Sequence, residues 1–281
     1  MDAVMLCMKK RGIRFFKKIR FSNTDVLKFH EKYSFLMHLS AYRNDHENIL
    51  IFAHGSNNSI LTTSRDPTKK YMPYISEDDT NVFFNDFVFS VSCLTANSFG
   101  KKCIDNGAVA YLGYQVEFSS IFNSTSEEKT RIPKRISIAI DTVIKHIFID
   151  SLAIAYEDFL TSPISVEAFK QYFSFLLEKE LTALLSIDLD TLYSRYGIKV
   201  ISRHYEKYIV DLVLRVLAEI KEILPRLVCL GDSNYISPSF VKYYLKRISM
   251  EELYNEINNN ESFLSTSDEN KRLILSEIGF M

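Results

Sequence analysis

Three short apolar segments in the first half of the chain constrain the fold more than any other feature. They span residues 48–53, 87–92 and 108–114, and they are rich in Val, Ile, Phe, Leu and Ala. Runs of this length and composition are typical of strands buried on both faces. Residues 94–106 have helical character, and Asn106-Gly107 would end that helix. Strand, loop, strand, helix, strand is the order expected of an α/β protein with an open, mostly parallel sheet and flanking helices.

The segments around these strands suggest further elements. Residues 3–8 are apolar and residues 13–21 alternate apolar with basic side chains, which favours a β-hairpin. The alternative for this basic stretch is an arm that binds an acidic partner. Asn23-Thr24-Asp25 offers N-cap residues for a helix that would run to Tyr42. Residues 59–86 are polar, so we interpret them as an irregular connection.

The second half of the chain is predicted to be mainly helical. Helical periodicity appears in residues 136–156, 163–185, 205–224, 238–247 and 268–278. Residues 198–202 suit one more strand, and residues 228–234 are interpreted as a loop between helices. We therefore expect an α/β core over residues 1–130 and a mainly helical region over residues 131–281, which would be regulatory or bind a partner. The helical region is either a separate domain or packed on the same sheet.

Composition and charge exclude several functional classes. The 281-residue chain has a net charge of −1, which does not favour direct nucleic-acid binding. Its most apolar stretch, residues 136–156, is interrupted by Asp141, Lys145 and Asp150, whereas a spanning helix needs about 20 residues with few charges. The basic N-terminus lacks the long apolar run of a secretory signal. We therefore expect no membrane partner.

The cysteines and histidines indicate reduced thiols rather than a disulfide or metal framework. The four cysteines are dispersed along a large chain: Cys7, Cys93, Cys103 and Cys229. This favours a cytoplasmic protein. No zinc-ligand spacing, Gly-rich phosphate loop or dinucleotide motif is present, so we expect neither a metal nor a cofactor.

His54 and Cys93 stand directly after two of the apolar strands. Reactive groups in open α/β sheets lie beyond the carboxyl ends of the strands, so we expect these two side chains to be neighbours. An imidazole beside a thiol makes it a strong nucleophile near neutral pH. Cys93 would also open the helix at residues 94–106, whose dipole stabilises a thiolate. A lone Cys or His at such a place is more often a core or loop residue, so the combination is what indicates catalysis.

Three segments in sequence order resemble a known family: Ile49 to Gly55, Phe89 to Asn97 and Gly107 to Tyr114. Together they are similar to the caspase-like cysteine peptidases, the clan of caspases, gingipains and CHAT (caspase–HetF-associated) proteins. The gingipain and CHAT branch is the most similar. The resemblance covers residues 45–120 and implies a caspase-like open sheet. It also implies a catalytic dyad of His54 and Cys93, with the Gly55 backbone N–H as the oxyanion donor.

This chain departs from the family pattern around the cysteine. The Gln-Ala that precedes the caspase cysteine and the glycine two places after it are absent, because Val91-Ser92 and Leu94-Thr95 stand there. Val91 also occupies the place where metacaspases and clostripain-like enzymes have an Asp that holds a basic substrate side chain. We therefore infer no preference for Arg or Lys. Glu117, just past the third strand, is a candidate to line a substrate pocket.

The resemblance implies a cysteine-type endopeptidase that hydrolyses a peptide bond in a protein substrate. Its prokaryotic relatives often serve as regulated effectors, including in antiviral defence, so a regulatory protein partner is also expected. Two alternatives remain open at this point. One is a non-catalytic binding or assembly module on the same fold, and the other is an acyltransferase that uses the same dyad.

Overall fold

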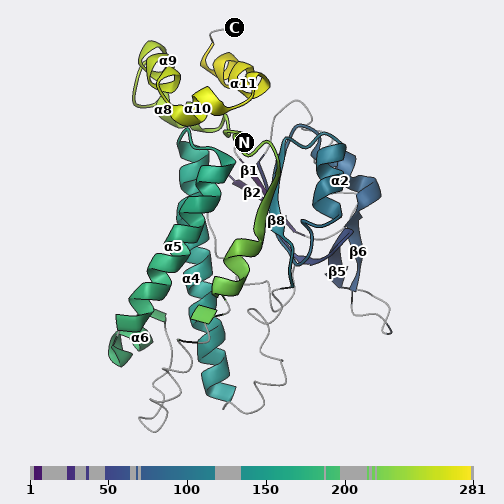
Figure 1. Cartoon of the computed structure of the whole chain (residues 1–281), viewed down its shortest axis with the longest axis vertical. Helices are drawn as coiled ribbons and strands as arrows, with labels where there is room; N and C mark the ends of the chain where they lie inside the picture. Colours follow the sequence, from purple (N-terminus) through teal and green to yellow (C-terminus); the bar gives the residue numbers. More distant parts are fainter. Residues whose placement is uncertain are drawn as a thin grey trace.

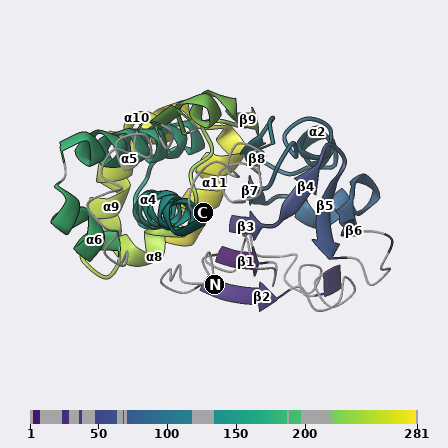
Figure 2. The same ribbon diagram turned by 90° about the horizontal axis from the view of Figure 1, so that it is seen from below.

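In the part of the chain that the structure describes, one open sheet has six strands in the order β2-β1-β3-β7-β8-β9. The computed structural model describes residues 3–7, 24–28, 36–37, 48–63, 68, 71–117, 134–186, 188–196, 214, 217–218 and 220–279. The strands are β1 (Ala3–Cys7), β2 (Thr24–Lys28), β3 (Asn48–Phe52), β7 (Phe87–Val91), β8 (Ala110–Tyr114) and β9 (Leu227–Gly231). The first five pair in parallel, and β9 pairs antiparallel with β8. The prediction of a mostly parallel α/β sheet is confirmed, and Figure 2 shows the strands side by side.

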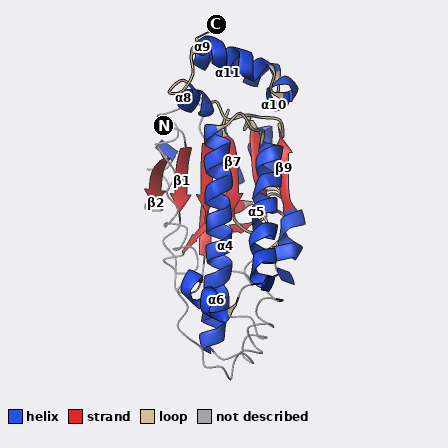
Figure 3. Ribbon diagram, turned by 90° about the vertical axis from the view of Figure 1, so that its left-hand side faces the viewer, coloured by secondary structure: helices blue, strands red, loops and turns tan. Residues whose placement is uncertain are grey.

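Two long helices cover one face of the sheet (Figure 3). Aromatic rings join the two layers: Phe87 of β7 lies 5.0 Å from Phe159, and Phe89 lies 5.6 Å from Phe169, between ring centroids. All four side chains are buried. The two long helices are α4 (Lys134–Thr161) and α5 (Val166–Ser186), and the shorter α6 (Leu189–Tyr196) follows α5. The second half of the chain therefore shares its core with the sheet.

A short helix and a second sheet lie on the side of the main sheet away from α4 and α5 (Figure 1). The second sheet is antiparallel, with the order β4-β5-β6. Its strands and neighbours are β4 (His54–Ser56), β5 (Ser59–Thr63), β6 (Tyr71–Ser76), the 3₁₀ helix η2 (Glu77–Phe83) and the helix α2 (Phe99–Asp105).

Four C-terminal helices form a cap at the amino ends of the parallel strands (Figure 1). They have a small core of their own, which includes Phe240, Leu253 and Ile274. Asn48, the first residue of β3, donates a hydrogen bond from Nδ2 to Ser237 Oγ at 2.8 Å and so ties the sheet to the segment that leads into the cap. The helices of this C-terminal cap are α8 (Phe240–Tyr244), α9 (Met250–Asn258), α10 (Glu261–Ser265) and α11 (Asp268–Ile278), and the 3₁₀ helix η5 (Leu224–Arg226) precedes β9.

The predictions for the N-terminal segments were wrong in two respects. Residues 24–28 form β2 rather than the start of a helix, because this segment pairs in parallel with β1. The hairpin between residues 3–8 and 13–21 is also wrong, since both edges of β1 are occupied by β2 and β3. Residues 13–21 and the predicted strand at 198–202 lie outside the described residues.

Two further segments predicted as irregular are regular. Residues 59–86 contain β5, β6 and η2, because this segment pairs with the short strand that begins at His54. Residues 228–234 were interpreted as a loop, but residues 227–231 form β9, which is the antiparallel edge of the main sheet. Among the described residues, no helix has the length and apolar character needed to cross a bilayer.

Candidate functional site

His54 and Cys93 follow two adjacent strands of the main sheet, beyond the carboxyl ends of these strands. β3 and β7 pair in parallel, with Phe52 opposite Val91. Each of the two candidate residues lies two positions beyond this last pair, so their backbones leave the sheet side by side. The expectation that strand order would bring these two segments together is confirmed, and both residues are half-buried.

Gly55 makes the close approach between the two segments feasible. A Cβ at this position would lie 2.4 Å from the Cys93 carbonyl oxygen, 2.6 Å from the Thr95 methyl group and 3.0 Å from Ser92 Cβ. Real Cβ atoms do not come this close to a backbone oxygen, so the backbone after His54 can touch the Cys93 turn only with glycine here.

The hairpin of β4 and β5 sets the direction of the Gly55 N–H. Ser56 pairs with Ser59 across the two-residue turn, and Gly55 pairs with Ile60. The pair that flanks a two-residue turn exchanges both backbone hydrogen bonds, and hydrogen-bonded pairs alternate with non-hydrogen-bonded ones. The Gly55–Ile60 pair is therefore non-hydrogen-bonded, and the Gly55 N–H points away from β5.

The edge of β4 toward which this N–H points faces the turn after Cys93. Two residues further on, Asn57 exposes its backbone at the same edge, and its carbonyl oxygen accepts hydrogen bonds from Ser98 N at 3.2 Å and Phe99 N at 2.7 Å. β4 is also an edge strand of its sheet. The edge of β4 that carries the Gly55 N–H therefore faces the segment that follows Cys93.

The turn after Cys93 is held by backbone hydrogen bonds to the end of β8 and the loop that follows it. Leu94 has a φ of 61°, in the left-handed region that a residue of this type seldom adopts. Its N–H donates to the Val116 carbonyl at 3.2 Å, and Ala96 N–H donates to the Tyr114 carbonyl at 3.1 Å. Strain of this kind persists only where the surroundings enforce it, and it is concentrated at functional sites.

Tyr71 contacts the candidate base directly. Its hydroxyl oxygen lies 3.1 Å from His54 Nε2, and the two ring centroids are 4.5 Å apart with an interplanar angle of 49°. Tyr71 is the first residue of β6, in the region that we predicted to be irregular. Sequence reasoning missed this residue, because only the pairing of β4, β5 and β6 brings it to His54.

Polar side chains lie on the segments that flank the candidate residues. Asn97 Nδ2 donates to Asn57 Oδ1 at 3.0 Å and to the Gln115 carbonyl at 3.3 Å. Glu117 is exposed and follows Val116, whose carbonyl binds the residue after Cys93. The loop after β8 therefore places Glu117 at the same end of the parallel strands as His54 and Cys93.

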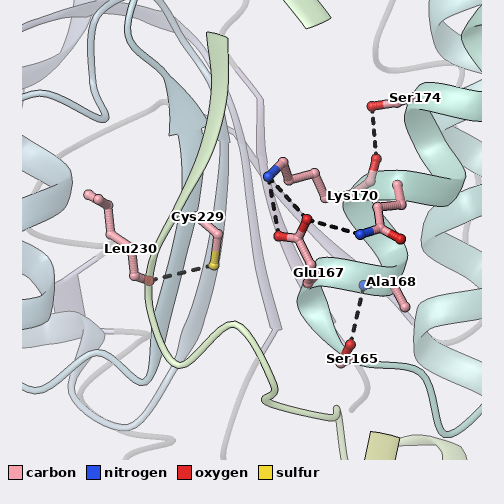
Figure 4. Close-up of polar contacts among 8 residues, drawn as sticks. Ser165, Glu167, Ala168, Lys170, Ser174, Cys229 and Leu230 are labelled. Carbon is pink, nitrogen blue, oxygen red and sulfur yellow. Dashed lines mark hydrogen bonds and ion pairs between the residues drawn. The ribbon is translucent and has the colours of Figure 1, made fainter. Parts of the chain in front are cut away.

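The other three cysteines belong to the packed interior or its border. Cys7 and Cys103 are buried, and burial raises the pKa of the Cys103 thiol well above its usual range. Cys229 lies on β9 and faces α5 near the ion pair between Glu167 and Lys170 (Figure 4). Burial, with a further contribution from the Glu167 carboxylate, raises the pKa of the Cys229 thiol to about 12. These environments disfavour a thiolate and leave Cys93 as the candidate nucleophile.

One expected feature of the site is wrong. Cys93 does not open a helix: α2 begins at Phe99, and residues 93–98 form turns. The helix was predicted to start earlier because Leu94 and Ala96 suit a helix, whereas their N–H groups bond to the loop after β8. Any activation of the Cys93 thiol must therefore come from neighbouring groups rather than from a helix dipole.

The described part of the chain holds no group of three or more His, Cys, Asp or Glu side chains arranged to bind a metal ion. Comparison of the sequence with known protein families found no matching family, and a search among curated proteins found no match either.

Proposed function

We propose that the protein is a caspase-like cysteine peptidase that hydrolyses a peptide bond through Cys93 and His54. The observation that carries this proposal is the meeting of the two strand ends, where Gly55 touches the Cys93 carbonyl. A nucleophile, a base and a backbone donor are the parts that acyl transfer needs. In this proposal all three come from β4 and from the turn that begins at Cys93.

In the proposed reaction the Cys93 sulfur attacks the scissile carbonyl carbon, and its proton passes to His54. The Gly55 N–H donates a hydrogen bond to the oxygen that becomes negatively charged. The C–N bond then breaks, and the leaving amine takes the proton from His54. Water hydrolyses the resulting thioester with His54 as base, which releases the carboxylic acid and restores the thiol.

The substrate would be a segment of another protein that adopts an extended form at the mouth of the site. Glu117, the Asn97 side chain and the backbone carbonyl of Gln115 belong to the segments that flank the candidate residues and would contact the substrate. The C-terminal cap and the outer faces of α4 and α5 would dock a regulatory protein partner. The action we propose is cytoplasmic, where cysteines stay reduced.

The experiment that tests this proposal needs no known substrate. Alkylation of each cysteine by iodoacetamide is followed by mass spectrometry from pH 5 to 9 in wild type, His54→Ala and His146→Ala. His146 is a half-buried histidine of α4 that packs on Tyr196, so its removal is the matched control. We expect Cys93 in wild type and in His146→Ala to react at pH 6 at least about tenfold faster than in His54→Ala.

Each outcome bears on the proposal. A thiol of ordinary pKa, about 8.5, is almost entirely protonated at pH 6. If Cys93 behaves in this way with or without His54, the dyad does not exist and a non-catalytic binding module becomes the better description. If the dyad exists, cleavage of a protein library that is lost in Cys93→Ala separates a peptidase from an acyltransferase, which would join its acyl group to an amine instead of water.

A further inference from the structure

The hydroxyl of Tyr71 is a hydrogen-bond partner of one of the two ring nitrogens of His54, the candidate base. The Tyr71 oxygen and His54 Nε2 are 3.1 Å apart, within hydrogen-bond distance, and the rings are in contact. A neutral imidazole carries its proton on one nitrogen and accepts on the other. Because Nε2 is engaged with Tyr71, the nitrogen that would serve Cys93 in the proposed dyad is Nδ1.

If Nδ1 must accept the thiol proton, the Tyr71 hydroxyl has to accept a hydrogen bond from His54 rather than donate one. If Tyr71 donated its proton to Nε2, then Nδ1 would carry the ring proton and could not accept the proton of the Cys93 thiol. If Tyr71 accepts from Nε2–H, the lone pair of neutral His54 lies on Nδ1. After proton transfer both nitrogens are protonated, and the Tyr71 oxygen still accepts from Nε2–H.

We propose that Tyr71 is a positioning residue, whose hydroxyl accepts the Nε2–H of His54, fixes the tautomer with Nδ1 as the acceptor, and stabilises the imidazolium that forms when Cys93 ionises. This inference rests on the proposed function, since it assigns Tyr71 a role in the same dyad. A hydrogen bond to the charged form of a group favours that form, so the contact favours a paired thiolate and imidazolium.

A β-bulge in β6 places Tyr71 on the same face as His54. His54 pairs with Leu61, and Leu61 pairs with Pro73. Side chains of directly paired residues share a face, and so do residues two positions apart in a strand, so Tyr71 lies on the face of His54.

The bulge itself is what makes this register possible. The pairing jumps from Ile60–Ile75 to Leu61–Pro73, which leaves Tyr74 as an extra residue on β6. Without it Leu61 would oppose Tyr74, and Tyr71, three positions away, would lie on the opposite face. Pro73 has no N–H to donate and is tolerated where the ladder is interrupted. Bulges commonly re-aim side chains in this manner beside active sites.

The test compares Tyr71→Phe with Tyr74→Phe. Tyr71→Phe keeps the ring that packs on His54 and removes only the hydroxyl. Tyr74→Phe removes the hydroxyl of a buried tyrosine from the same strand and is the matched control. The nitrogen chemical shifts of the His54 ring, measured by NMR from pH 4 to 9, report both the tautomer and the pKa.

In wild type and in Tyr74→Phe we expect neutral His54 to carry its proton on Nε2. In Tyr71→Phe we expect a mixture of tautomers and a His54 pKa lower by about one unit, since a charge-assisted hydrogen bond is lost. The rate of Cys93 alkylation at pH 6 should fall about three- to tenfold in Tyr71→Phe and stay unchanged in Tyr74→Phe, with similar thermal stability in both.

The two measurements separate this inference from the proposed function. Unchanged His54 shifts and an unchanged alkylation rate in Tyr71→Phe overturn the role of Tyr71, and leave the dyad intact if Cys93 still depends on His54. Wild-type protonation of neutral His54 on Nδ1 also overturns it. If Cys93 is inert whatever residue stands at position 54, the proposed function fails. The role of Tyr71 as a positioning residue in the reaction then fails too, even if the NMR shows that its hydroxyl orients His54.

Discussion

Gly55 and Cys93 lie so close that a Cβ on the glycine would come within 2.4 Å of the cysteine carbonyl oxygen. Gly55 is the residue after His54, and Cys93 begins the turn that follows β7. The contact holds the backbone of the candidate base against that of the candidate nucleophile. It also makes residue 55 a sensitive probe of the site.

Gly55→Ala should destabilise the protein and separate β4 from the turn that begins at Cys93. The added methyl group meets a backbone oxygen and the Thr95 side chain, and neither can move away without disturbing buried Ser92. Overpacking of this kind costs about 1–3 kcal/mol, which denaturant unfolding would measure. Gly279→Ala is the comparison: nothing lies closer than 3.9 Å there, so only the positive φ of 85° opposes it. If Cys93 alkylation in folded Gly55→Ala matched wild type, the contact would be irrelevant to the site.

Strands buried on both faces were recognised from sequence because their signal is local. β3, β7 and β8 are short apolar runs whose every residue is buried, and each begins within two residues of the predicted start. Helix α11 was predicted with the observed bounds from its helical periodicity. In the structure Ser267 caps its first turn and Gly279 ends it in the left-handed region. His54 and Cys93 followed from the same strand ends.

Elements that depend on distant pairing could not be predicted in this way. β2 has N-cap residues and helical spacing, yet it pairs with β1. β9 is stabilised as a strand by β8, which lies more than a hundred residues earlier in the chain. Tyr71 reaches His54 only through two strand pairings and one bulge. Local propensity carries no information about such contacts, because packing partners decide them.

Removal of residues 131–281 should prevent the remaining chain from folding. The truncation deletes β9 and both long helices, so the face of the sheet that carries Phe87 and Phe89 would be exposed to water. Each buried Phe contributes about 1.5–3 kcal/mol, so the loss exceeds the usual stability of a domain when the whole face is counted. We expect an aggregated product or one without near-ultraviolet dichroism. A folded truncation with reactive Cys93 would show instead that residues 1–130 are an independent domain.

Asn270→Ala should loosen the C-terminal cap from the sheet. The side chain is 3% exposed and makes both hydrogen bonds to Ile236, accepting from its N–H at 2.8 Å and donating to its carbonyl at 3.0 Å. Truncation leaves two buried backbone groups without partners, at about 1–3 kcal/mol each. Asn259→Ala is the control, because its side chain bonds an exposed helix carbonyl and should change stability by less than about 0.5 kcal/mol.

Hydrogen exchange would locate the effect of Asn270→Ala. We expect faster exchange for the amides of α9 and α11 and little change for β3 and β7, since the cap has a core of its own. Uniform loss of protection across the sheet would show that the cap and the sheet unfold as one unit.

Stability should fall in alkaline solution, and Cys229 should account for part of the loss. Burial raises the pKa of the Cys229 thiol from 9.0 to about 12, so the folded state holds the proton more tightly than the unfolded state. The stabilisation from this difference is fully present below pH 9 and is lost as the pH rises from 9 toward 12. Between pH 8 and pH 10 this loss lowers the free energy of unfolding by about 1 kcal/mol, because the unfolded thiol ionises and the folded one does not.

Cys229→Ala tests this prediction. It should be less stable than wild type at pH 8, because packing is lost, and its free energy of unfolding should fall less than that of wild type between pH 8 and pH 10. Equal losses in the two proteins, measured by urea unfolding at both pH values, would mean that the Cys229 thiol titrates in the folded state as it does in the unfolded chain.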